Sequence, residues 1–128
     1  MKVEHVAFNV VQPVAMAKWW CENLGFRVVR AGGPPAHGHF LADSAGSTVI
    51  EIYHNSSAAV PDYAAMALPT LHVAFLCDDP LAMREKLIAA GASPLGDTIR
   101  NDSGDVITEV RDPFGMAIQL VKRGKNLL

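Results

Sequence analysis

The chain has 128 residues, and half of them are hydrophobic, which is enough for one compact domain or for two small modules that share a core. A formal net charge of −2 gives no basic face, so nucleic acid and anionic membranes are poor partners and a small molecule is the expected one. No apolar stretch approaches membrane-spanning length and no signal-peptide pattern opens the chain, so we expect a cytoplasmic protein.

The tetrapeptide His-Val-Ala-Phe occurs twice, at residues 5–8 and 72–75. The first copy continues to Pro-Val-Ala-Met at 13–16, and the second continues in the same register to Pro-Leu-Ala-Met at 80–83. Each copy predicts an apolar strand, a turn and a helix that begins at a proline and stops at a glycine. The chain is therefore expected to be an internal duplication.

In the first half, alternation predicts a strand whose His5 and Ala7 share one face while Phe8 and Val10 share the other. The helix after it carries Trp20 at core spacing. The expected elements are a strand at 3–10, a helix at about 14–23, and strands at 26–30, 39–42 and 48–54, the last with Glu51 at its centre.

The second half repeats this plan after a stretch rich in Ser, Ala and Pro that has no clear period. Asp79 is the expected N-cap of its helix. The expected elements are a strand at 71–77, a helix at 80–90, a short strand at 93–95, a segment at 99–100, and strands at 106–111 and 117–122. We therefore predict a first module at 1–56, a linker at 57–70 and a second module at 71–128, each a βαβββ unit.

Three sequence marks make the chain resemble the vicinal oxygen chelate superfamily, which includes glyoxalase I, the extradiol dioxygenases and the bleomycin-resistance proteins. The marks are the paired His-Val-Ala-Phe starts, Asn-Leu-Gly-Phe at 23–26 and Arg-Asp-Pro-Phe-Gly at 111–115. The resemblance implies an α+β fold in which two tandem βαβββ modules with curved mixed sheets enclose a cleft. It also implies one small-molecule site with a divalent metal on the cleft floor, and a homodimer.

Carried over by position, the resemblance implies four metal ligands: His5, Glu51, His72 and Gln119. This mixed N/O set suits Zn, Ni, Co, Mn or Fe(II). Gln119 departs from the family pattern, because glyoxalase I and the dioxygenases carry a carboxylate there. The departure counts against dioxygenase chemistry and leaves Glu51 as the candidate catalytic residue, either as a ligand or as a displaced base.

Duplication alone would copy a histidine without any function, so the histidine pair is weak evidence for a metal. The stronger observation is that most of the two halves has diverged, whereas these positions remain two histidines and a carboxylate and carboxamide pair on the same expected strand faces. Four polar side chains on converging faces are also costly to bury without a shared partner. Two functions stay open: a metal-dependent lyase or isomerase of the glyoxalase type acting on a small oxygenated substrate, and a metal-free protein that binds or sequesters a small molecule. The candidate stacking residues of such a binder are Trp19, Trp20, Phe40, Tyr53 and Phe114.

Overall fold

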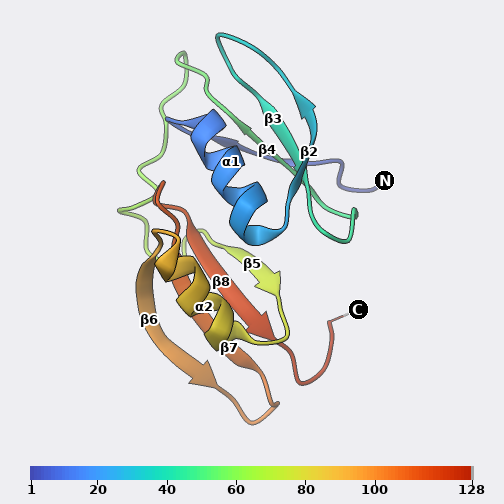
Figure 1. The fold of residues 1–128 in the computed structure, drawn as a ribbon, viewed down its shortest axis with the longest axis vertical. Coiled ribbons are helices and arrows are strands. Elements are labelled where there is room, and N and C mark those ends of the chain that lie inside the picture. Colours follow the sequence, from blue (N-terminus) through green and yellow to red (C-terminus); the bar gives the residue numbers. More distant parts are fainter. Residues whose placement is uncertain (128) are drawn as a thin grey trace. The chain divides into compact units, whose positions relative to one another are not determined.

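The computed structural model describes residues 1–127. It divides into two compact units, Met1–Pro61 and Asp62–Leu128. Each unit contains one helix that lies across a four-stranded mixed sheet (Figure 1). The fold is α+β, and the two tandem modules follow the predicted order of a strand, a helix and three strands.

The first unit contains β1 (Val6–Asn9), α1 (Pro13–Leu24), β2 (Arg27–Ala31), β3 (His39–Ala42) and β4 (Val49–Tyr53). Its sheet has the order β1-β4-β3-β2, and β1 runs parallel to β4 while the other pairs are antiparallel. This order places the first strand of the unit directly beside its last strand. Residues far apart in the sequence, near 7 and near 51, therefore become neighbours.

The helix α1 buries one apolar stripe against its own sheet. Met16, Ala17 and Trp20 are almost fully buried, and the Trp20 ring lies 5.4 Å from the ring of Phe26. Gly25 ends the helix with a left-handed φ of 75°, which glycine adopts without strain. Trp20 is thus a core residue, and its role as a ligand-stacking residue in the binder hypothesis is wrong because its side chain has no exposed surface.

The second unit contains β5 (Val73–Leu76), α2 (Pro80–Ala89), β6 (Ser93–Arg100), β7 (Val106–Arg111) and β8 (Ala117–Lys122). Its sheet order, β5-β8-β7-β6, repeats that of the first unit. The prediction of a separate strand at 93–95 and a segment at 99–100 is wrong, because the single strand β6 includes both ranges. Its register against β7 shifts between Leu95 and Ile99, and Gly96 has a positive φ of 63° at the shift.

Residues 62–70 belong to the second compact unit and pack against its last hairpin. The Arg111 guanidinium donates hydrogen bonds to the carbonyl oxygens of Tyr63, at 2.8 Å, and Gly115, at 2.9 Å, and also to the carbonyl of Met66. Tyr63 is itself buried. Neither helix within residues 1–127 has the length and apolar character needed to cross a bilayer.

Candidate functional site

Glu51 lies in the middle of β4, where it pairs with Ala7 of β1 on one side and with Phe40 of β3 on the other. Side chains at directly paired positions project from the same face of a sheet. His5 immediately precedes β1 and is two residues from Ala7, so it projects from that face too. The opposite face carries the buried Ile50 and Ile52, which belong to the core under α1.

The structure brings His5 and Glu51 together, as the sequence predicted for one face. His5 Nε2 lies 3.5 Å from Glu51 Oε2, and the two side chains are 34% and 22% exposed. The Phe40 ring meets the imidazole edge to face, with centroids 5.4 Å apart and planes at 84°. Gly38 is also close, since a Cβ there would lie 3.6 Å from Glu51 Oε1. The pair is therefore flanked by the Phe40 ring and the Gly38 backbone, and it remains partly exposed to solvent.

Glu4 holds the other nitrogen of the His5 ring. Nδ1 is hydrogen-bonded to the Glu4 carboxylate, and this bond is the main reason that the pKa of His5 lies above its ordinary value of 6.5. Desolvation lowers the pKa, whereas the negative charges of Glu4 and Glu51 raise it further. A carboxylate accepts hydrogen bonds, so Nδ1 carries the proton and Nε2 is the nitrogen with the lone pair when the ring is neutral.

The His5 and Glu51 pair has the chemistry of a metal half-site. Histidine ligands usually donate their second ring nitrogen to a carboxylate or carbonyl, as His5 does to Glu4. Two ligand bonds of roughly 2.1 Å can span at most roughly 4.2 Å between donor atoms. The 3.5 Å between His5 Nε2 and Glu51 Oε2 is within that limit. The two donors therefore fit one divalent transition-metal ion without a change of backbone.

In the second unit the two candidate ligands have separate partners. His72, just before β5, donates from Nδ1 to the carbonyl oxygen of Leu68 at 3.1 Å, which again leaves Nε2 as the lone-pair nitrogen of the neutral ring. Gln119 of β8 pairs with Ala74, two residues after His72, so both project from the same sheet face. The Gln119 amide is bonded to Glu109 and not to His72.

Glu109 is a site residue that the sequence reasoning missed. It lies on β7 directly opposite Gln119, is only 5% exposed, and accepts a hydrogen bond of 3.0 Å from Gln119 Nε2. A signal was present in the sequence, because a charged residue in the middle of an apolar strand is rare. The short turn after Arg111 also fixes the hairpin register that sets position 109 opposite position 119.

A hydrogen bond from the ring Nδ1 does not by itself distinguish the candidate ligands His5 and His72 from the other histidines. His39 and His54 also donate from Nδ1 to carbonyl oxygens, of His37 at 2.6 Å and of Val10 at 2.8 Å. Within residues 1–127, no group of three or more His, Cys, Asp or Glu side chains is placed so that it could hold a metal ion. The feature that sets His5 apart is the Glu51 carboxylate opposite its second nitrogen.

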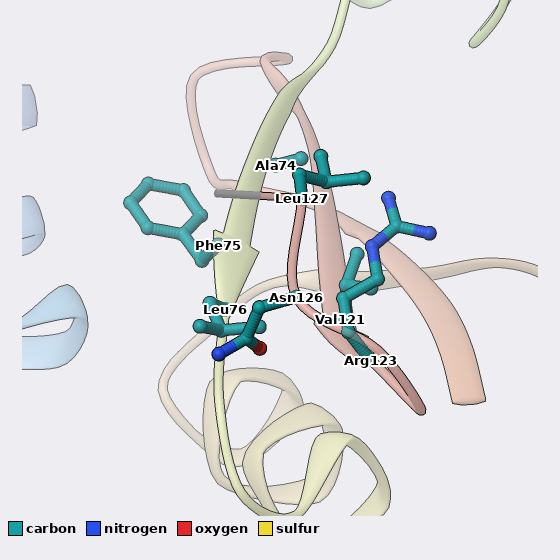
Figure 2. A pocket seen from close by; sticks show the side chains of 7 residues that line it. All are labelled: Ala74, Phe75, Leu76, Val121, Arg123, Asn126 and Leu127. Carbon is teal, nitrogen blue, oxygen red and sulfur yellow. The ribbon is translucent and has the colours of Figure 1, made fainter. Parts of the chain in front are cut away.

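A pocket of about 330 Å³ opens on the sheet of the second unit, beside β5 and β8 (Figure 2). Its lining is mostly apolar, with two polar side chains from the end of the chain: Ala74, Phe75, Leu76, Val121, Arg123, Asn126 and Leu127. Leu76 pairs with Val121, two residues beyond the pair of Ala74 and Gln119, so the pocket adjoins Gln119 on the same face. Phe75 points away from the other labelled side chains (Figure 2).

Asp105 anchors the segment that completes this pocket. Its carboxylate accepts hydrogen bonds from the Gly124 backbone N–H at 2.9 Å and from the Arg123 guanidinium at 2.8 Å. These two bonds, that of Gly124 first, hold the pKa of Asp105 below its ordinary value. The segment after β8 is therefore tied to the β6–β7 loop just before it reaches Asn126 and Leu127.

The comparisons with known proteins agree with this architecture. The family model described as the Glyoxalase/Bleomycin resistance protein/Dioxygenase superfamily matches residues 2–120. Among curated proteins no match was found. A solved glyoxalase family protein from Enterococcus faecalis is 27% identical, with a TM-score of 0.71 over 94% of this chain and 97% of that one.

Two further solved structures share the fold at lower identity. A glyoxalase I mutant from Zea mays is 21% identical, with a TM-score of 0.73 over 94% of this chain and 45% of that one. TnmS3, an antibiotic binding protein from a Streptomyces species, is 18% identical, with a TM-score of 0.68 over 96% of this chain and 98% of that one.

Proposed function

The chain belongs to the glyoxalase/bleomycin resistance protein/dioxygenase superfamily, and from that premise we propose that it is a divalent-metal-dependent enzyme of the lyase or isomerase type. Its substrate is a small oxygenated molecule that chelates the ion. The observation that carries the proposal is the His5 and Glu51 pair, with Nε2 and Oε2 at 3.5 Å and the other ring nitrogen bonded to Glu4.

The ligand set that we propose is His5, Glu51, His72 and Gln119, with Zn, Ni, Co, Mn or Fe as the ion. Both histidines bond through Nδ1, which supports ligation through Nε2. Gln119 bonds through its amide nitrogen, which supports ligation through its oxygen. Nitrogen and oxygen donors in this mixture favour a transition metal over Ca or Mg.

When bound, a divalent ion would supply polarisation of a chelating substrate oxygen and so acidify a neighbouring C–H bond or water. If Glu51 is displaced from the ion, its carboxylate would take up that proton. Ala7 and Phe40 flank Glu51 on the neighbouring strands, and the Phe40 ring contacts the imidazole of His5 edge to face.

Metal content tests this proposal. Protein purified without a tag or chelator should bind about one equivalent of a transition metal, and the His5→Ala/His72→Ala double variant should lose it. His37→Asn is the matched control, because His37 has a positive φ of 47° that asparagine tolerates.

Glu51→Gln should lower turnover of an enolisable carbonyl substrate by about 10²–10⁴-fold if the carboxylate moves the proton. Absence of metal after incubation with Ni, Co, Mn and Zn would reject the enzyme.

The pocket beside β5 supports a second candidate function, a metal-free protein that binds a small molecule. Its walls are mainly apolar, which suits a planar or amphipathic ligand of limited size. TnmS3 supports the proposal as an antibiotic binding protein with the same fold. Ligand binding that is unchanged by chelators and by the His5→Ala/His72→Ala variant, but lost in Leu76→Arg, would favour this function over the enzyme.

We further propose that the protein acts in the cytoplasm as a homodimer, on the sequence grounds given above. We also propose that residues 57–70 are the linker that joins the two modules.

A further inference from the structure

Equivalent rows of residues cross the two sheets, and they differ in where the carboxylate stands. In the first unit the row is Ala7, Glu51 and Phe40, on β1, β4 and β3. In the second unit the row is Ala74, Gln119 and Glu109, on β5, β8 and β7. Each row carries one carboxylate, but in the second unit that carboxylate is one strand farther from the first strand of the module.

One oxygen of the Glu109 side chain is hydrogen-bonded, and the other lies close to Gly96. Oε1 accepts the hydrogen bond of 3.0 Å from Gln119 Nε2. Oε2 lies against Gly96, where an added Cβ would come within 3.3 Å of it. The Arg84 side chain of α2 also donates from Nε to the Glu109 carbonyl oxygen at 3.4 Å, which ties this part of β7 to the helix. A buried carboxylate in this position determines which end of the Gln119 amide faces it.

A carboxylate only accepts hydrogen bonds, whereas a primary amide has one donating end and one accepting end. Gln119 must therefore turn its nitrogen toward Glu109, because the opposite orientation would set two oxygens against each other. With the nitrogen engaged by Glu109 of β7, the amide oxygen is the end left for a different partner, and β5 is the strand on the other side of β8. His72 precedes β5 and projects from the same face.

We propose that Glu109 is a positioning residue, which selects the orientation of the Gln119 amide so that its oxygen, the end able to bind a metal, is presented on the His72 side. This inference rests on the metal site proposed above and deepens it. It explains how a carboxamide serves at a position where relatives use a carboxylate. The negative charge of this row lies on Glu109 of β7, the strand next to β8. There it orients Gln119 and does not contact the ion.

The first test is Co²⁺ affinity in solution, measured for the wild type, Glu109→Gln and Glu85→Gln. Glu85→Gln is the control, because it removes the same charge from an exposed position on α2. The amide introduced at position 109 accepts either end of Gln119, so the orientation is no longer selected. Affinity should fall about 10–100-fold in Glu109→Gln, as for other residues that orient a metal ligand, and stay unchanged in Glu85→Gln. Equal affinity in all three proteins overturns the proposal.

The second test needs no metal. In ¹⁵N-labelled protein, the side-chain NH₂ signal of Gln119, assigned by its absence in Gln119→Glu, should shift in Glu109→Gln and not in Glu85→Gln. An unshifted signal overturns the role of Glu109. If the signal shifts in Glu109→Gln but the wild type binds no Co²⁺, the metal site of the proposed function is rejected, and with it the ligand role of the Gln119 oxygen. The failure of the metal site and the failure of the role of Glu109 therefore give different results.

The third test exchanges the two side chains. Glu109→Gln/Gln119→Glu has the same composition as the wild type and keeps the hydrogen bond with its direction reversed. It should bind Co²⁺ at least as tightly as the wild type, because the carboxylate now occupies the ligand position. Affinity no better than that of Glu109→Gln alone would contradict the proposal. Cooperative thermal unfolding of each variant shows that the comparison is between folded proteins.

Discussion

His5 is held between two carboxylates, with Glu4 on Nδ1 and Glu51 opposite Nε2. This arrangement raises the pKa of the imidazole above 6.5, chiefly through the Glu4 hydrogen bond. A proton and a metal ion compete for the same nitrogen. A site of this kind releases its metal on acidification earlier than a site built on an unperturbed histidine.

We therefore expect metal affinity to fall as the pH is lowered through the raised pKa of His5, by up to about tenfold per pH unit below it. The fall should begin above pH 6.5, and its onset should move to lower pH in Glu4→Gln, which removes the main cause of the shift. An NMR titration of the His5 ring protons in metal-free protein measures the same pKa directly. A midpoint that does not move in Glu4→Gln would contradict the assignment.

The same shift contributes to folding stability with a definite sign. Because the pKa of His5 is higher in the folded than in the unfolded chain, its contribution is fully present below pH 6.5 and is lost as the pH rises through the folded value. The difference in unfolding free energy between wild type and Glu4→Gln should therefore shrink from mildly acidic to alkaline pH.

Sequence alternation was sufficient to place His5 and Glu51 on one face, because a strand with one covered face admits only one assignment. It was not sufficient to find Glu109, whose role depends on a cross-strand partner. Nor did it find Glu4, since an exposed acidic residue beside a histidine carries no signal until the backbone directs the two side chains together.

At the scale of the element, the two helices begin in different ways. Asp79 caps α2, with its carboxylate accepting a 3.0 Å hydrogen bond from the Ala82 backbone N–H, whereas Gln12 makes no side-chain capping bond at the start of α1. Asp79→Ala should lower the unfolding free energy by about 1 kcal/mol, and Gln12→Ala should change it little. Chemical denaturation of both variants checks this, and equal effects would contradict it.

The turn between β7 and β8 depends on a glycine. Gly115 has φ of 94°, and a Cβ added there would lie 2.8 Å from the Ala64 backbone nitrogen. Gly115→Ala should therefore destabilise the protein by about 1–3 kcal/mol. Gly33→Ala, at a loop position with open space around the added Cβ, should be close to neutral. A thermal unfolding midpoint for Gly115→Ala equal to that of Gly33→Ala would contradict the reading of this turn.

Three strands that adjoin turn residues were predicted with the bounds that the structure shows: 39–42, 106–111 and 117–122. β6 was predicted as two pieces because Pro94 and Gly96 interrupt its pattern. The structure accommodates both at an edge strand, where one side of the backbone needs no partner and the register shift absorbs the irregularity.

At the scale of the whole molecule, the duplication made the fold predictable, since two copies of one pattern define a module more firmly than either copy alone. The proposed homodimer has no such support from periodicity. Light scattering coupled to size exclusion at micromolar concentration should give twice the 13.7 kDa of one chain. A mass of one chain would reject the dimer.

The pairing of Glu109 with Gln119 also has an evolutionary consequence. Replacing Gln119 by glutamate first would force two carboxylates into contact in a buried row, which opposes folding. Replacing Glu109 by glutamine first leaves two amides that can still bond to each other. A lineage moving between the two arrangements would therefore pass more easily through loss of the β7 charge than through gain of the β8 charge, so the order of substitutions is constrained even where the end points are equivalent.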